Sequence, residues 1–96
     1  MRVTGPLLKV LGVFVSKPGE EVYGLELVRT TGLKSGTLYP LLDRLETAGL
    51  VTSRWEDANP SSQGRPRRRF YSLNGYGVHE ARQILIEHGA GMWSWT

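Results

Sequence analysis

The chain has 96 residues, no cysteine, 40% hydrophobic residues and a formal net charge of +3. This length predicts one domain with a single modest core, and the apolar content is too high for a disordered chain. The absence of cysteine excludes disulfides and thiolate metal sites, and no apolar run approaches the roughly 20 residues that span a bilayer. With no evident N-terminal signal peptide, a cytoplasmic protein without a membrane partner is expected.

The excess positive charge is concentrated in one polar segment. Residues 54–69 carry five arginines against Glu56 and Asp57, whereas the charges of the rest of the chain cancel. A localised basic patch is typical of a protein that binds a polyanion, and the alternative is a solvated basic loop.

The first predicted element is a helix over residues 4–16. Thr4 is a candidate N-cap, Pro6 suits an early helical position, and only Lys9 interrupts the apolar run before Ser16. A helix that is apolar on nearly all sides must be covered on more than one face. The pattern leaves two readings open: a central helix buried in its own domain, or a helix whose spare face meets a partner subunit.

Residues 22–31 predict a short second helix. Leu25 and Val28 are placed on its inner side, with Tyr23 beside them and Leu27 at the edge of the core. A turn with glycine at residues 31–33 leads into a third helix, so the pair predicts a helix-turn-helix.

The third predicted helix, residues 35–48, has two distinct faces. Helical spacing gives an apolar stripe of Leu38, Leu41, Leu42, Leu45 and Ala48. The opposite side carries Gly36, Tyr39, Pro40, Asp43 and Thr47, with Thr37 and Arg44 on one flank. Ser35 is the predicted N-cap and Gly49 the stop, while Pro40 indicates either a start near Thr37 or a distorted first turn. Such a helix has the right shape for a major groove.

Two strands are predicted after this helix, at residues 50–55 and 68–73. The polar segment 56–67 joins them as a basic loop. The predicted fold is therefore α+β and mostly helical, a winged helix-turn-helix with a two-stranded β-wing.

Residues 74–88 predict the last helix, with Asn74 as its cap. Its stripe consists of Val78, Ala81, Ile84, Leu85 and His88. An amphipathic terminal helix suits a dimer interface. We therefore expect a DNA-binding part at residues 1–73 and a dimerisation part, helix and tail, at residues 74–96, together forming one compact unit.

Catalytic constellations are missing from the sequence. His79 and His88 lie nine residues apart, so one helix would point them to different sides. There is no metal-ligand cluster, nucleophile elbow or phosphate-binding glycine loop. The sequence predicts neither an enzyme nor a bound metal or cofactor.

Three motifs closely resemble the PadR-like winged-helix transcriptional regulators. They are Ser-Gly-Thr-Leu-Tyr-Pro-Leu-Leu at 35–42, Arg-Leu-Glu and Gly-Leu-Val at 44–46 and 49–51, and Gly-Arg-Pro-Arg at 64–67. The resemblance runs from about Leu8 to Gln83 and implies a dimeric DNA-binding repressor whose C-terminal helix pairs the subunits. Most members carry a longer C-terminal helix or a further helical region, whereas this sequence stops after one short helix. No effector residues are therefore carried over.

Two elements supply the predicted DNA contacts. The helix offers Lys34, Ser35, Thr37, Tyr39, Pro40 and Arg44, and the loop offers Arg65, Arg67 and Arg69. The resemblance places Tyr39 and Pro40 on the recognition surface; the alternatives are a packing aromatic for Tyr39 and a solvated helix face for Arg44. Strand alternation puts Arg67 and Arg69 on one side and Arg68 on the other. The Gly-Arg-Pro sequence also resembles the core of minor-groove AT-hook peptides.

The predicted dimer interface consists of Leu7, Leu11, Phe14, Val78, Ala81 and Leu85. Trp93 and Trp95 allow three readings: a latch over that interface, a site for a small aromatic effector such as some relatives bind, or an exposed tail. Two functional hypotheses follow. The first is a homodimeric repressor of transcription, released by a small aromatic ligand. The second is a winged-helix module for protein interaction or assembly without specific DNA binding.

Overall fold

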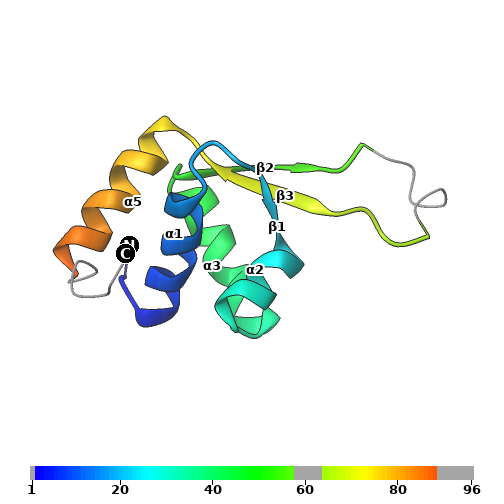
Figure 1. Ribbon diagram of the computed structural model, residues 1–96, viewed down its shortest axis with the longest axis horizontal. Coiled ribbons are helices and arrows are strands. Elements are labelled where there is room, and N and C mark those ends of the chain that lie inside the picture. Colours follow the sequence, from blue (N-terminus) through cyan, green and yellow to red (C-terminus); the bar gives the residue numbers. More distant parts are fainter. Residues whose placement is uncertain (1, 58–63, 89–96) are drawn as a thin grey trace.

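The computed structural model describes residues 2–57 and 64–88, which form a helical body with a β-hairpin projecting from it (Figure 1). The elements in chain order are α1 (Gly5–Ser16), β1 (Val22–Tyr23), α2 (Gly24–Thr31), α3 (Ser35–Thr47), β2 (Val51–Trp55), β3 (Arg69–Leu73) and α5 (Gly75–Glu87). No described helix has the length and apolar character needed to cross a membrane.

The strands form one antiparallel sheet in the order β1-β3-β2. In the hairpin, Val51 pairs with Leu73 at its base and Trp55 with Arg69 further out. The two predicted wing strands are confirmed, but the sheet has a third strand that the sequence analysis missed. Val22 and Tyr23 pair with Tyr71 and Phe70 of β3, almost 50 residues further along the chain. The fold is a winged helix with a three-stranded sheet.

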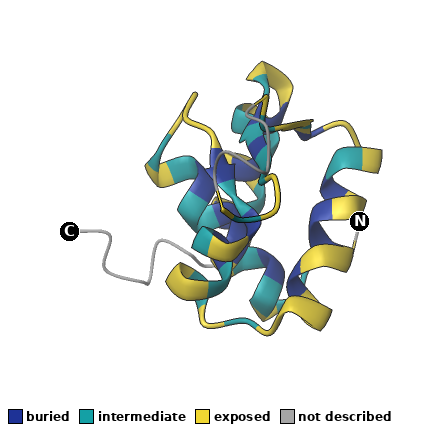
Figure 2. Ribbon diagram, turned by 90° about the vertical axis from the view of Figure 1, so that its right-hand side faces the viewer, coloured by how far each residue is buried: buried dark blue, intermediate teal, exposed yellow. Residues whose placement is uncertain are grey.

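α1 is the central helix of the body. It contacts α2, α3, α5 and β3, and its buried residues Leu7, Val10, Leu11 and Phe14 are at most 1% exposed. Figure 2 shows the buried residues of the helices facing one another across a single core. Thr4 caps the helix as predicted, its Oγ1 accepting a hydrogen bond from the Leu7 N–H at 3.3 Å. One side of this apolar helix is buried in its own domain, whereas Leu8, Val13 and Val15 are only partly buried. Contact of that spare face with a partner subunit stays a prediction.

The inner face of α2 differs from the prediction. Leu27 is fully buried and Leu25 is 48% exposed, whereas the sequence analysis placed Leu25 inside and Leu27 at the edge. The helix begins later than predicted, because Val22 and Tyr23 form β1 and α2 starts only at Gly24. With that start, the side of α2 that carries Leu27 faces the core and Leu25 faces outward. Gly32 ends this helix in a left-handed conformation, its N–H bonded to the Val28 carbonyl.

Three predicted positions at helix ends are also wrong. Lys34, not Ser35, is the N-cap of α3, and Ser35 is the first helical residue. Ala48 is exposed at the C-cap of α3, and His88 is exposed at the C-cap of α5, so neither extends an apolar stripe. The helical spacing of apolar residues in a sequence can continue beyond the last turn of the helix. The residue there has left the helix, so its side chain no longer points toward the buried face.

α5 packs against α1 and begins at a tight junction with the sheet. Asn74 caps it as predicted, with Oδ1 accepting from the Gly77 N–H and Nδ2 donating to the Gly49 carbonyl, both at 2.7 Å. A Cβ at Gly77 would overlap the Leu50 carbonyl, so glycine is what lets helix and backbone approach.

This packing places most of the predicted dimer interface inside the protomer. Five of its six residues, namely Leu7, Leu11, Phe14, Ala81 and Leu85, are buried in the core of the protomer itself. Only Val78 is half-buried at its margin. The apolar residues that α5 leaves outside are Tyr76 and Ile86, which are 57% and 70% exposed. A long apolar stripe cannot reveal whether it faces its own domain or a second copy, because both bury it equally well.

Candidate nucleic-acid interface

The exposed face of α3 is held in place by the core leucines on its other side. Leu38, Leu42 and Leu45 have no exposed surface. Every residue that the sequence analysis placed on the opposite face or flank is exposed, namely Gly36, Thr37, Tyr39, Pro40, Asp43, Arg44 and Thr47. The two-faced helix is thus confirmed. Pro40 lies inside α3, which begins at Ser35, so of the two readings of Pro40 a start near Thr37 is wrong.

The N-terminus of α3 is open to solvent. Lys34 supplies the N-cap through its backbone, and its carbonyl accepts from the N–H groups of Thr37 and Leu38 at 3.0 and 2.9 Å. No side chain caps this terminus, and Lys34, Ser35 and Thr37 are all exposed. A helix N-terminus with hydroxyls and a lysine beside it attracts anions such as a phosphate.

Tyr39 is both exposed and packed. Its side chain is 40% exposed, and its ring lies against Gly24, where a Cβ would overlap the Tyr39 hydroxyl. The first residue of α2 therefore fixes the direction of this α3 side chain. The two readings of Tyr39, recognition residue and packing aromatic, are compatible because one edge packs while the other faces solvent.

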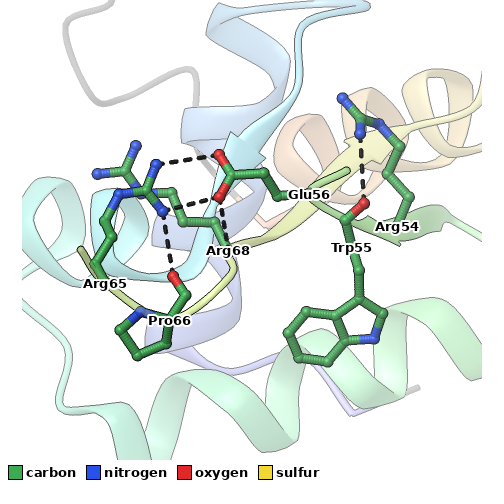
Figure 3. Close-up of polar contacts among 6 residues, drawn as sticks. All are labelled: Arg54, Trp55, Glu56, Arg65, Pro66 and Arg68. Atoms are coloured by element: carbon green, nitrogen blue, oxygen red, sulfur yellow. Dashed lines mark hydrogen bonds and ion pairs between the residues drawn. The ribbon is translucent and has the colours of Figure 1, made fainter. Parts of the chain in front are cut away.

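Beyond the paired strands, the carboxylate of Glu56 holds the base of the wing loop together. Glu56 accepts two hydrogen bonds from Arg65, with Nη1–Oε1 at 2.8 Å and Nη2–Oε2 at 3.1 Å, and a longer one of 3.4 Å from the Arg68 N–H (Figure 3). Arg65 also donates to the Pro66 carbonyl at 3.2 Å. The hydrogen bond from Arg65 holds the pKa of Glu56 below its ordinary value of 4.5.

The face of the wing that continues into the core carries Arg67 and Arg69. Both guanidinium groups lie over the Trp55 ring, at 5.8 and 5.1 Å from its centroid. Arg69 also donates to the Ser53 hydroxyl at 2.8 Å and lies 3.6 Å from a carboxylate oxygen of Glu46 on α3. The hydroxyl of Ser53 in turn donates to Glu46 at 2.6 Å. Arg69 thus ties the wing to α3.

The other face of the wing carries Arg54 and Arg68. Arg54 pairs with Glu21 through two hydrogen bonds of 2.6 and 2.7 Å and covers the Phe70 ring. The Arg68 guanidinium lies 4.1 Å from the centroid of the Tyr23 ring, which meets Phe70 edge-on. The predicted alternation, with Arg67 and Arg69 on one side and Arg68 on the other, is therefore confirmed.

An open groove of about 580 Å³ runs between the wing, the start of α2 and the exposed face of α3. Aromatic and arginine side chains dominate its wall. The lining residues are Tyr23, Gly24, Leu25, Tyr39, Trp55, Arg65, Pro66, Arg67, Arg68, Arg69 and Tyr71. The groove brings together the predicted residues Tyr39, Arg65, Arg67 and Arg69 from the two elements.

Other predicted residues lie outside this groove. Arg44 is exposed further along α3 and lines a separate shallow groove with Arg2, Asp43, Thr47 and Ala48. The sequence analysis did not place Tyr23, Trp55 and Arg68 at the site. The signal for Trp55 was the pairing of the two predicted strands, because in the hairpin Trp55 is the cross-strand partner of Arg69. Tyr23 could not be placed in this way, because it depends on the unforeseen strand β1.

Nothing in the described part of the chain suggests a metal centre, since no group of three or more His, Cys, Asp and Glu side chains comes together there. Trp93 and Trp95, the predicted latch or ligand residues, lie outside the described residues.

Comparison with known proteins agrees with this architecture. The model of the transcriptional regulator PadR-like family matches residues 10–83. No curated protein is significantly similar in sequence. Among solved structures, smu.1704 from Streptococcus mutans is 26% identical with a TM-score of 0.69, the match covering 96% of this chain and 85% of that one.

Two further structures share the fold at lower identity. Bacillus subtilis PadR in complex with operator DNA is 20% identical with a TM-score of 0.66, covering 83% of this chain and 47% of that one. The PcaV transcriptional regulator from Streptomyces coelicolor, in complex with its natural ligand, is 22% identical with a TM-score of 0.72, covering 92% and 57%. The chain thus spans about half the length of these two regulators.

Proposed function

This chain belongs to the PadR-like family of transcriptional regulators, and from that premise we propose that it is a homodimeric repressor that binds double-stranded DNA. One observation carries the proposal. A polar, exposed helix face anchored by buried leucines stands beside a wing that holds the excess positive charge of the chain, with an open groove between them. Such a surface matches a duplex, which offers a major groove for the helix and phosphates for the wing.

In the proposed complex, α3 enters the major groove with its N-terminal half foremost. Thr37, Tyr39 and Arg44 face base edges or the groove walls, and Pro40 shapes the surface between them. Lys34 and Ser35 lie at the open N-terminus, where a phosphate gains both the lysine charge and the helix dipole. The wing lies along the flanking minor groove or its backbone, where arginine is favoured in a narrow groove.

Two copies are proposed to bind two half-sites, because a two-fold dimer presents two such helices about 34–36 Å apart, one turn of DNA. Occupying a promoter in this way would block the polymerase. The exposed Ile86 of α5 is the best position to test the pairing. Ile86→Glu should shift the mass measured by light scattering from dimer to monomer, whereas Gln83→Glu adds the same charge at an exposed neighbour and should not. An unchanged mass for Ile86→Glu would remove α5 from the interface.

We further propose that a small aromatic effector binds the protein and releases it from DNA. This proposal is supported by the resemblance to regulators that respond to aromatic compounds. The test is to titrate a panel of planar aromatic acids and amines into the protein bound to labelled DNA. A compound that releases the DNA and raises the unfolding temperature of the free protein would identify the effector class. If no compound does either, the effector part of the proposal fails and DNA binding stands.

The deciding experiment is fluorescence-anisotropy binding to the duplex immediately upstream of the gene that encodes this protein. A shuffled duplex of equal composition is the control, and both are measured at low and physiological salt. A preference of roughly a thousandfold at physiological salt would establish specific binding. Equal, salt-sensitive binding to both would mean a different operator or an architectural role. Binding to neither would favour a protein-interaction module, a reading to which the exposed Leu25 and Trp55 at the groove lend some support.

A further inference from the structure

The wing arginines differ in what holds them. Arg65 and Arg69 each lie within ion-pair distance of a carboxylate, 2.8 Å from Glu56 and 3.6 Å from Glu46 respectively. These contacts place negative charge beside each guanidinium, and in Arg65 they also occupy N–H groups of both terminal nitrogens. A phosphate would have to compete with an internal partner at both positions.

Arg67 and Arg68 are held by aromatic rings without an ion pair, whereas Arg69 lies over the Trp55 ring as well as beside Glu46. Arg67 lies over Trp55 and Arg68 over Tyr23, and neither side chain makes an ion pair with a carboxylate in residues 2–57 and 64–88. A ring face attracts a guanidinium without cancelling its charge, and it leaves the N–H donors at the edge of the group for another acceptor. Such a contact fixes the side chain in advance, so less entropy is lost when a phosphate or a base edge is bound.

We propose that the wing divides its arginines by function: Arg67 and Arg68 contact DNA, whereas Arg65 and Arg69 are positioning residues held by Glu56 and Glu46. This inference rests on the proposed DNA binding and sharpens it. It differs from the sequence-based prediction of Arg65, Arg67 and Arg69 as contacts. Because Arg67 and Arg68 point to opposite faces at the base of the wing loop, DNA would meet both sides of the hairpin there, as it would a hairpin seated in a groove.

Salt dependence separates the two roles. Each phosphate contact adds about 0.9 to the slope of log affinity against log salt concentration. Arg67→Ala and Arg68→Ala should each reduce that slope by about one per bound wing, measured by anisotropy on a labelled duplex of fixed arbitrary sequence. Arg65→Ala should lower affinity with an unchanged slope. Arg82→Ala, an exposed arginine on α5, is the matched control for loss of one positive charge.

The positioning role is tested by a double-mutant cycle between Glu56→Gln and Arg65→Gln. If Arg65 acts through its pair with Glu56, each single variant and the double variant should lose affinity by a similar factor, because each breaks the same pair. Asp57→Asn removes an equal charge one residue further on and should not lower affinity. Thermal unfolding of every variant checks that the fold is retained. If an alanine variant unfolds, Arg65→Gln or Arg67→Gln, which also removes the charge, replaces it.

The outcomes separate this inference from the proposed function. If the natural protein binds no duplex, DNA binding itself is refuted. If it binds and Arg65→Ala flattens the slope as much as Arg67→Ala, the division of the arginines is overturned while DNA binding stands. The same holds if Arg67→Ala and Arg68→Ala leave the slope unchanged.

Discussion

The two parts of the candidate interface, α3 and the wing, are stabilised in different ways. α3 rests on Leu38, Leu41, Leu42 and Leu45, which are at most 5% exposed. Burying one such side chain contributes about 1.5–3 kcal/mol. Beyond β2 and β3, the wing depends on surface ion pairs and cation–π contacts, each of which contributes about 1 kcal/mol or less.

This difference indicates that the position of α3 is fixed more firmly than that of the wing. The helix is part of the core, so its direction is fixed as firmly as the fold. The base of the wing loop is held by weaker surface contacts, so it can adjust its position more easily than α3. A rigid helix beside an adaptable wing suits a protein that reads bases with one element and follows a backbone with the other.

Removing a core anchor of α3 should have the largest effect. Leu42→Ala is expected to lower the free energy of unfolding by about 2–5 kcal/mol, because the side chain is fully buried and leaves a cavity. Urea denaturation followed by circular dichroism measures this loss. The control is Leu25→Ala, a leucine that is 48% exposed, which should change stability by about 0.5 kcal/mol or less. Equal losses would contradict the observed phase of α2.

The next largest effect should be on recognition without loss of stability. Gly24→Ala places a methyl group where the Tyr39 hydroxyl lies, and the end of the tyrosine side chain can move away more easily than the backbone. Preference for operator over random duplex should fall about tenfold, as for the loss of one specific contact. The unfolding temperature should stay within a few degrees, since alanine is the better helix former. If Gly24→Ala kept full preference for the operator while Tyr39→Ala lost it, the position that Gly24 sets for the Tyr39 side chain would not contribute to sequence preference.

On the wing, Trp55→Ala removes the ring beneath Arg67 and Arg69. Affinity for any duplex should fall by about two- to fivefold, the equivalent of a cation–π contact at an exposed site. Trp55→Phe keeps a ring at this position and should recover most of the loss. Anisotropy at one fixed salt concentration is sufficient to rank the three proteins. Full affinity for Trp55→Ala would mean that the ring does not prearrange Arg67.

Acid should have the smallest and most local effect. Arg65 lowers the pKa of Glu56, so this pair stabilises the fold above the ordinary carboxyl pKa of 4.5 and ceases to do so as the pH falls through the lowered value. The unfolding temperature of Glu56→Gln should therefore be below that of the natural protein at neutral pH. The two should converge in acid, in thermal scans across this range. A constant difference at all pH values would mean that the carboxylate charge is not what stabilises the loop.

Local patterns predicted most of the elements and the two faces of α3. The stripe of leucines, the caps at Thr4 and Asn74 and the basic loop depend on residues close together in the chain. The errors arose where distant segments decide the structure. β1 exists because Val22 and Tyr23 find β3, and that pairing moved the start of α2 and exchanged the roles of Leu25 and Leu27.

The candidate site shows the same division. The sequence identified Tyr39, Arg65, Arg67 and Arg69, because residue type and charge are visible in it. It did not indicate that Arg65 and Arg69 pair with Glu56 and Glu46, nor that Trp55 lies under Arg67 and Arg69 and Tyr23 under Arg68. Those partners are set by strand register and by the packing of the wing against α3.

By itself, the sequence determined that this chain forms a winged helix in which α3 has one polar face and the wing carries positive charge, because periodicity, caps and charge are local properties. Only the tertiary structure decided which apolar faces are core and which arginines already have carboxylate partners. Burial and ion pairing depend on which residues meet in space, and in this fold those residues come from separate elements, as Glu46 of α3 and Arg69 of β3 do.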